Sequence, residues 1–241
     1  MNTIKVNLEN VKMIAHRGLS GIERENTCPV FVAAGNRSYF GIETDIHKSA
    51  DGKFVILHKE TLSEVSMGKY DLSVEKCSYD EVKDLILPDK DGSFTRQDIR
   101  VPLLSDYIKI CKKYDKKCVL ELKNVHPEEE MKLLIDEIKS LDYLDNMIFI
   151  SFMFANCKTL RSLLPDAKIQ YLCRTPSEET LEKMFDLRFD MDIYYPDLTP
   201  ELVKAMHDNS LEVNVWTCDS KADAQKLAEM GVDYITTNIL E

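Results

Sequence analysis

The sequence lacks any long apolar run, and this excludes the common kinds of membrane-inserted protein. Its first stretch, MNTIKVNLENVKMIA, has no apolar segment of the kind that a secretory signal needs. No later stretch approaches the roughly 20 consecutive apolar residues of a membrane-spanning helix. We therefore expect a soluble, cytoplasmic protein without stable membrane insertion.

Cysteine pairs with metal-ligand spacing are also missing. The chain has seven cysteines, an odd number, and they are scattered without a CxxC motif. This distribution favours reduced and mostly buried thiols. The seven are Cys28, Cys77, Cys111, Cys118, Cys157, Cys173 and Cys218.

The chain also lacks an excess of positive charge. The chain has 31 Lys and Arg against 42 Asp and Glu, which gives a net charge of −11 and a pI near 5.0. Extended binding to nucleic acid or to an anionic membrane needs clustered cationic side chains, so neither partner is expected. A phosphate-bearing substrate would need a local cationic feature, and a bound metal ion is one candidate. The oligomeric state is left open by these numbers.

The pattern of apolar runs indicates the fold. From residue 101 onward, short apolar runs alternate with longer segments of helical period, as in repeated βα units. Two further strands are expected at 12–15 and 40–46, which brings the total to about eight. A (β/α)8 TIM barrel of one domain over residues 1–241 is the favoured fold, with an open doubly wound sheet as the alternative. The later strands are expected at 118–122, 147–151, 168–172, 192–196, 212–216 and 233–237.

One segment breaks this rhythm. After the turn at Asp51-Gly52 a strand-like FVILH follows, and residues 59–100 have no clear period. We interpret 59–100 as an insertion after the second strand, with one helix near SYDEVKDLIL.

Carboxylates end two of the predicted strands. In such barrels the catalytic groups come from the C-terminal ends of strands. Glu43 and Asp45 are two residues apart, so they project from the same face of their strand, and Glu121 ends the next barrel strand. Buried carboxylates at this position need compensation, which a divalent cation supplies. Oxygen ligands without cysteine favour Mg2+ or Ca2+ over Zn2+.

Histidines and cationic side chains follow the same strand ends. His16 and His58 both end apolar runs, and an ordinary histidine pKa allows one to accept and the other to donate a proton near neutral pH. Arg17 and Lys123 could hold phosphate oxygens. Trp216 ends the strand at 212–216. A structural role remains the alternative for each of these residues. Of the other histidines, His47 is expected in a supporting position, His126 in a loop and His207 on the surface.

The ordered set of short motifs resembles the glycerophosphodiester phosphodiesterase family. The motifs are AHRG (15–18), ENT (25–27), ETD with DG (43–45 and 51–52), LH (57–58), LELK (120–123), SF (151–152), VWT (215–217) and GVDYITT (231–237). The likeness runs from about residue 13 to 239. Each motif alone is weak, but eight in the right order make chance an inadequate explanation.

The resemblance implies a set of roles. It implies a (β/α)8 barrel with a small insertion after the second strand, and a metal-dependent reaction that releases glycerol 3-phosphate and an alcohol from a small glycerophosphodiester. Glu43, Asp45 and Glu121 would hold one divalent metal, and His16 and His58 would be the acid and base. Arg17 and Lys123 would hold the phosphate, and Trp216 would pack on the alcohol or glycerol part of the substrate.

The chain departs from the family pattern beside the insertion. Arg24 stands where proline usually precedes ENT, and Lys59 follows His58 where aspartate is usual. These changes remove no expected ligand or proton carrier, but they bear on substrate choice. The alternatives are a barrel that has lost catalysis and only binds a phosphate ester or cation, and an enzyme that cleaves lysophospholipids.

Overall fold

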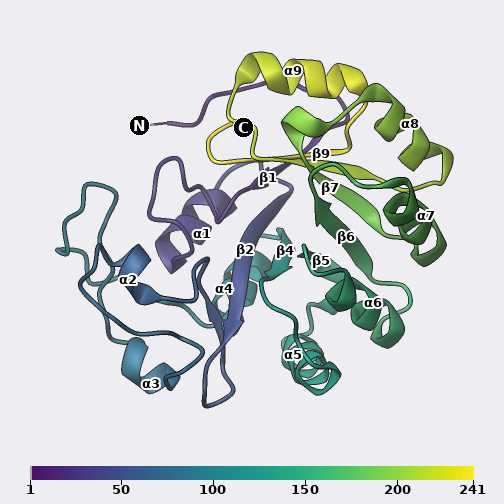
Figure 1. Cartoon of the computed structure of the whole chain (residues 1–241). Coiled ribbons are helices and arrows are strands. Elements are labelled where there is room, and N and C mark those ends of the chain that lie inside the picture. Colours follow the sequence, from purple (N-terminus) through teal and green to yellow (C-terminus); the bar gives the residue numbers. More distant parts are fainter. Residues whose placement is uncertain (1) are drawn as a thin grey trace.

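A computed structural model describes residues 2–241 as a closed barrel of eight parallel strands. Figure 1 shows the strands at the centre and the helices around them. Strands β1 and β2 pair directly, and this pairing closes the ring. The (β/α)8 prediction is therefore confirmed, and the open sheet is excluded. The barrel strands are β1 (Lys12–Ala15), β2 (Gly41–Lys48), β4 (Lys117–Leu122), β5 (Met147–Ser151), β6 (Lys168–Cys173), β7 (Asp190–Tyr194), β8 (Val213–Trp216) and β9 (Tyr234–Thr237).

Seven helices connect successive barrel strands and cover the outside of the barrel. Thr199 caps its helix through Leu202 N, at 3.3 Å, and Ser177 does the same for Thr180 N, at 3.2 Å. Gly231, with φ of +93°, ends the last helix, since glycine adopts this left-handed conformation readily. The helices are α1 (Cys28–Gly35), α4 (Leu104–Lys113), α5 (Glu128–Ser140), α6 (Phe154–Leu163), α7 (Glu178–Leu187), α8 (Pro200–Asp208) and α9 (Lys221–Met230). Among the residues described, no helix has the length and apolar character needed to span a membrane.

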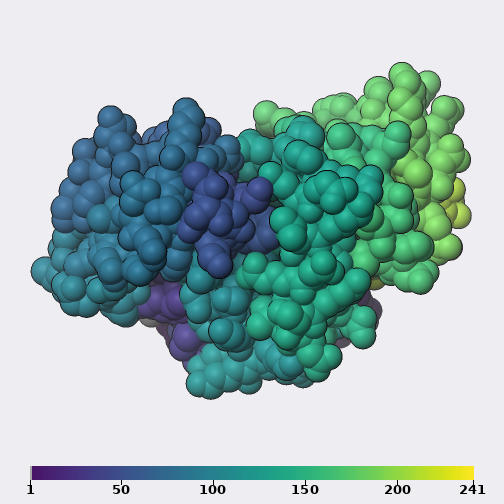
Figure 2. Space-filling view, turned by 90° about the horizontal axis from the view of Figure 1, so that it is seen from below, coloured from purple at the N-terminus to yellow at the C-terminus, as the bar shows by residue number. Residues whose placement is uncertain are grey.

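The segment between β2 and α4 stands to one side of the barrel. Strand β3 (Phe54–Ile56) runs antiparallel to the end of β2, and the single-turn helices α2 (Leu62–Val65) and α3 (Tyr79–Val82) follow it. The space-filling view shows this segment as a blue and teal mass beside the green C-terminal half (Figure 2). Its apolar side chains form a small core of their own, which includes Val55, Leu62, Val74 and Ile99.

Two details of the predicted elements were wrong. Strand β7 spans Asp190–Tyr194 and not 192–196, because Tyr195–Asp197 turns into a 3-10 helix around Pro196. The helix expected near SYDEVKDLIL is only the single turn Tyr79–Val82, because the chain then extends until Leu87 N donates to Ile99 O.

The barrel interior carries charged side chains at its N-terminal end and mostly apolar ones further along. At the N-terminal end, Lys12 and Lys168 form ion pairs with Glu212, and Lys168 also contacts Asp190 at 3.1 Å. Further along, the interior contains the buried polar side chains Gln170, Asn214 and Thr236 and the buried apolar side chains Ile14, Val119, Ile148, Ile150, Leu172 and Tyr234. This packed layer leaves the C-terminal end as the place where a cavity can open.

Candidate active site

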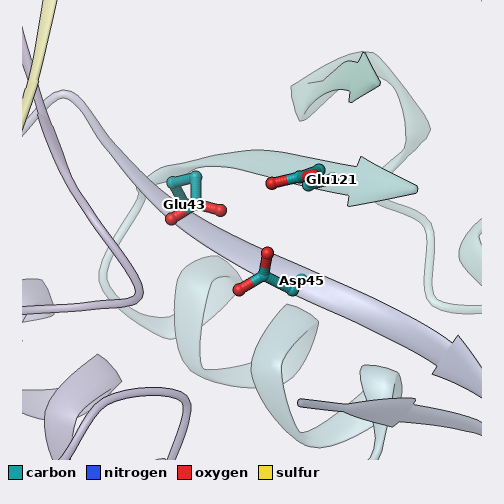
Figure 3. A group of neighbouring side chains, drawn as sticks. All are labelled: Glu43, Asp45 and Glu121. Atoms are coloured by element: carbon teal, nitrogen blue, oxygen red, sulfur yellow. The ribbon is translucent and has the colours of Figure 1, made fainter. Parts of the chain in front are cut away.

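Three carboxylates converge at the C-terminal end of β2 and β4. Asp45 and Glu121 are direct neighbours in the parallel register of the two strands, and Glu43 precedes Asp45 on the same face. Each offers one oxygen, and these oxygens lie within 4.8 Å of one another. Figure 3 shows the three side chains turned toward one another between the two strands. All three are buried, with exposed fractions of 3%, 0% and 8% for Glu43, Asp45 and Glu121.

The pKa values of these carboxylates are pushed apart. Burial, followed by the charge of Asp45, raises the pKa of Glu43 well above its usual range and that of Glu121 to about 7. Burial alone would also raise the pKa of Asp45, but the charges of Lys123 and Arg17 lower it to about 2. Without a cation, the site therefore disfavours full ionisation of all three groups.

Two cationic side chains flank the carboxylates. Lys123 Nζ lies 2.8 Å from Glu121 Oε1 and 3.3 Å from Asp45 Oδ1. Arg17 Nε lies 3.6 Å from Asp45 Oδ2, and its Nη1 lies 3.2 Å from Glu25 Oε1. The expected phosphate-binding residues thus lie beside the expected metal ligands.

The ENT motif supports this arrangement from the loop after β1. Glu25 is the partner of Arg17, and Asn26 Nδ2 donates to Asp45 Oδ2 at 2.9 Å. Asn26 Oδ1 in turn accepts from Thr44 Oγ1 at 2.7 Å. The sequence alone assigned no role to Glu25 and Asn26. In the structure, they orient Arg17 and Asp45.

The ring of His16 is held in one orientation by groups that follow the last strand. Its Nδ1 lies 2.8 Å from Asn238 Oδ1, and Asn238 Nδ2 donates to Asp219 Oδ2 at 2.6 Å. Because a carboxylate only accepts, the amide nitrogen of Asn238 faces Asp219 and its oxygen faces His16. His16 therefore carries its proton on Nδ1 when neutral. Its free Nε2 lies 4.0 Å from Glu43 Oε2.

Asn238 and Asp219 were not predicted from the sequence. Asn238 directly follows the final strand, as His16 and Lys123 follow theirs, whereas Asp219 lies in the loop between β8 and α9, and neither position alone indicates a contact with His16. Burial lowers the pKa of His16, followed by the charge of Arg17. The neutral imidazole is therefore the ordinary state of His16 in this site.

His58 reaches the same cavity from the insertion side. It follows strand β3, and the backbone bond from Leu57 N to Asp45 O, at 3.1 Å, joins this segment to β2. Burial lowers the pKa of His58 to about 3, so this histidine is also neutral near pH 7. The two histidines thus come from segments far apart in the chain and meet at one opening.

A cavity of about 110 Å³ gathers these groups. A larger hollow, of about 360 Å³, lies beside Lys168 at the opposite end of the strands. The smaller cavity is the candidate active site because the predicted proton carriers and cationic groups line it together. One wall is His16, Arg17, Glu43, His58, Glu121 and Lys123, and the other is Ile150, Phe152, Leu172, Asp192, Trp216 and Thr236.

Aromatic rings form the mouth of the second wall. The Trp216 ring lies 5.6 Å from Phe152 and 5.2 Å from Tyr194, measured between ring centroids. Trp216 Nε1 donates to the backbone oxygen of Asp192 at 3.3 Å. Phe152 is 38% exposed, so apolar surface reaches solvent at this edge.

The remaining histidines pair with carboxylates elsewhere. His47 Nδ1 lies 2.8 Å from Glu75 Oε1, and His126 Nδ1 lies 3.4 Å from Glu130 Oε2. His207 contacts Asp233 on the outside of the barrel. None of the three lines the 110 Å³ cavity.

The two departures from the family pattern both face the insertion. Arg24 Nη2 donates to Val65 O at 2.7 Å and so joins the loop after β1 to α2. Lys59 Nζ lies 3.4 Å from Glu64 Oε2, within the insertion. Both residues support the segment beside His58 and lie outside the lining of the cavity.

Comparison with known proteins gives a consistent result. The model of the glycerophosphoryl diester phosphodiesterase family matches residues 16–241. A glycerophosphodiester phosphodiesterase of Caldanaerobacter subterraneus subsp. tengcongensis is 28% identical over 94% of this chain and 93% of its own length. A solved glycerophosphodiester phosphodiesterase from Parabacteroides distasonis is similar at a TM-score of 0.80 and 29% identity, and covers 96% of this chain and 94% of its own. A phosphodiesterase of Oleispira antarctica, solved with the product sn-glycerol-3-phosphate, is similar at a TM-score of 0.85 and 25% identity over 94% and 92% of the two chains.

Proposed function

The chain belongs to the glycerophosphoryl diester phosphodiesterase family, and we propose that it hydrolyses small glycerophosphodiesters to glycerol 3-phosphate and an alcohol. The observation that carries this proposal is the meeting of three buried carboxylates, two neutral histidines and two cationic side chains around one cavity. The product bound by the Oleispira antarctica relative is consistent with it.

Glu43, Asp45 and Glu121 fit a single divalent ion. Apart from the ion pair with Lys123 at 3.3 Å, Asp45 Oδ1 is buried without a hydrogen bond among residues 2–241, and the three residues offer only oxygen ligands. Hard cations such as Mg2+ and Ca2+ prefer these ligands. When bound, such an ion would offset negative charge on the phosphoryl oxygens.

His16 is the proton acceptor in this proposal. Its Nδ1 proton is held by Asn238, so only Nε2 can accept a proton, and its lowered pKa keeps it unprotonated at neutral pH. The proton comes from the glycerol 2-hydroxyl or from a water, whichever attacks phosphorus. Asp219 and Asn238 then act as positioning residues.

His58 is the proton donor to the departing alkoxide. It lines the cavity from the other side, close enough to Asp45 for that carboxylate's charge to favour its protonated form. Burial still holds the pKa of His58 low, and a bound phosphodiester adds a second negative charge nearby that opposes this lowering. Protonated His58 can then supply the leaving group with a proton.

Arg17 and Lys123 hold the phosphoryl oxygens. Both now lie within 3.6 Å of Asp45, whose charge they compensate. A divalent ion on Asp45 would take over that task, so the guanidinium and ammonium groups could turn to the substrate. Guanidinium in particular binds two phosphate oxygens at once.

Product release from a substrate panel tests this function. The panel contains glycerophosphocholine, glycerophosphoethanolamine and a lysophosphatidylcholine, each with and without a chelator. We expect glycerol 3-phosphate from the first two, loss of turnover after exhaustive chelation, and recovery when Mg2+ or Ca2+ is restored. Calorimetric titration with each metal alone should show one site in the wild type and none in Asp45→Asn. Full turnover in chelator, or release only from the lysolipid, would overturn the proposal.

The two histidine roles can be separated by the leaving group. In a p-nitrophenyl ester of glycerol phosphate, the leaving group is p-nitrophenolate, which departs without needing a proton. His58→Ala should therefore recover much of its activity on this ester, whereas His16→Ala should not. The reverse pattern would exchange the two roles.

A further inference from the structure

Asp192 is a buried carboxylate that none of the steps above uses. It lies on β7, in register with Leu172 of β6 and Asn214 of β8. Its exposed fraction is 2%, and it lines the 110 Å³ cavity. Its Oδ1 has neither solvent contact nor a hydrogen-bond donor among residues 2–241. The nearby indole of Trp216 donates to the backbone oxygen of Asp192 and not to its carboxyl group.

This arrangement is unfavourable for the protein alone. A buried polar oxygen without a donor loses its hydration and receives nothing in return. On neighbouring strands, Asn214 Nδ2 donates to Gln170 Oε1 at 3.0 Å, and Thr236 Oγ1 donates to Asn214 Oδ1 at 3.1 Å. The barrel interior can therefore provide partners for polar groups, and at Asp192 Oδ1 it does not. Because Oδ1 is closed to solvent, a ligand in the cavity would meet the other oxygen, Oδ2, of the same carboxyl group. A carboxyl group without partners at a cavity is typical of a site that is completed by a ligand.

The position of Asp192 indicates which part of a ligand it meets. The phosphate-handling groups come from β1, β2 and β4 and from the segment after β3. Asp192 comes from β7, with β5 and β6 between it and β4 on one side. A phosphoryl group beside Arg17 and Lys123 leaves the β7 side of the cavity to the organic part of the substrate. That side also offers the apolar side chains of Leu172 and Trp216, which suit carbon atoms.

Hydrogen-bonding chemistry narrows the choice of group. A trimethylammonium head group has no N–H and cannot donate to a carboxyl oxygen, whereas a hydroxyl group can donate or accept. Burial, followed by the charge of Glu121, raises the pKa of Asp192 well above its usual range. A carboxyl group that is readily protonated is a good partner for a neutral hydroxyl and a poor one for a cation.

We propose that Asp192 determines specificity by forming a hydrogen bond with the terminal hydroxyl of the substrate's glycerol moiety. The glycerol then occupies the β7 side of the cavity with its carbons against Leu172 and Trp216, and the second alcohol of the diester extends toward the mouth. This inference rests on the proposed function. It adds one residue, Asp192, as the group that contacts the terminal hydroxyl.

Binding of two matched ligands tests the inference without requiring turnover. The ligands are sn-glycerol 3-phosphate and its analogue without the terminal hydroxyl, a phosphate ester of 1,2-propanediol, titrated calorimetrically into the metal-loaded protein. The wild type should prefer glycerol 3-phosphate by roughly 10- to 100-fold, the usual effect of a buried group losing its partner. Asp192→Leu should remove most of this preference, and Asp192→Asn should retain part of it. Thermal melts confirm that both variants are folded.

Gln170→Leu is the matched control. Gln170 lies on the neighbouring strand β6, and its Nε2 is also buried without a hydrogen-bond partner among residues 2–241. A water shared by Gln170 and Asp192 would make the carboxylate structural, and both variants would then change the two affinities equally. If Asp192→Leu loses affinity equally for both ligands, or loses affinity for neither, the inference is overturned. So does a selective loss of kcat/KM for glycerophosphoethanolamine over glycerophosphocholine, which would place the head group at Asp192. If the ligand preference holds while no diester is hydrolysed, the proposed function fails and the inference about Asp192 stands.

Discussion

Replacing Glu121 by glutamine should stabilise the metal-free protein. In the absence of a cation, Glu121 lies buried beside Asp45, and burial and that charge raise its pKa from an ordinary value of 4.5 to about 7. A carboxyl group with a raised folded-state pKa favours folding in its protonated form. Its penalty therefore appears as the pH rises from 4.5 toward 7 and is complete above 7.

The magnitude follows from the size of that shift. One pKa unit corresponds to about 1.4 kcal/mol, so a shift from 4.5 to about 7 gives roughly 3 kcal/mol at pH 8. Glutamine also loses the ion pair with Lys123, although Lys123 keeps Asp45 as a partner. We therefore expect a gain of about 1 to 3 kcal/mol, which for a chain of this size is roughly 2 to 10 °C in Tm.

Thermal melts in chelator at pH 5 and pH 8 measure this gain. The histidines complicate the pH profile of the wild type alone. The lowered pKa of His58, about 3, makes folding less favourable as the pH falls below 6.5, which is opposite in sign to the effect of Glu121. The difference between Glu121→Gln and wild type cancels this contribution. Glu9→Gln, at an exposed position, is the control for removal of one negative charge.

The metal should reverse the order of stability. With Mg2+ or Ca2+ present, the wild type should gain Tm with metal concentration, and Glu121→Gln should gain little because one ligand is neutral. A Glu121→Gln protein that is no more stable than wild type at pH 8 in chelator would refute the argument from carboxylate repulsion. So would an equal gain at pH 5 and pH 8.

Substitutions at four further residues test their individual roles. His16→Ala and His58→Ala should each lower kcat by roughly 10^2 to 10^4 with the fold intact by circular dichroism, and near-wild-type kcat in either would remove that histidine from the mechanism. Trp216→Ala should raise KM with roughly 0.5 to 2 kcal/mol of lost binding if the indole contacts a quaternary ammonium. A loss of about 3 to 5 kcal/mol of stability with unchanged KM would instead make Trp216 a core residue. Asn238→Leu should lower kcat by roughly 10- to 100-fold through loss of the fixed His16 tautomer, and Asn238→Asp, which keeps an acceptor oxygen, should lower it less. Equal kcat in the two Asn238 variants would contradict a positioning role.

The barrel could be predicted because its strands carry a local signal. Each βα unit has an apolar run followed by a helix, some of the helices have their own side-chain cap, as at Ser177 and Thr199, and such signals need no knowledge of distant residues. Strand β7 was misplaced by two residues because its inward-facing Asp190 looked like a loop residue. That acid is compatible with the interior only because Lys168, from β6, lies 3.1 Å away. A partner on another strand is invisible in the local pattern.

The residues of the site also divide into those with a local signal in the sequence and those that depend on contacts with distant residues. Glu43, Asp45 and Glu121 could be proposed from strand ends alone, since a parallel barrel brings all those ends to one face. Asn238 and Asp219 could not, because their effect on His16 depends on side-chain hydrogen bonds between the first strand and the last. Asp192 could not be identified either, because nothing in the sequence shows that a buried oxygen lacks a hydrogen-bond partner.

The charge of the cavity connects the acidic chain with its anionic substrate. Three carboxyl groups line the cavity, Asp45 is buried beside two of them, and only two cationic side chains are present, so without a metal the site would repel a phosphodiester. The raised pKa values of Glu43, Glu121 and Asp192 express the same imbalance within the protein. One divalent ion on Glu43, Asp45 and Glu121 would leave those ligands ionised and turn the phosphate side of the cavity positive. Because burial is the largest cause of the raised pKa of Asp192, its carboxyl group can remain neutral and bind a hydroxyl. The same cavity would then separate a charged end, which binds the phosphate, from a neutral end, which selects the glycerol.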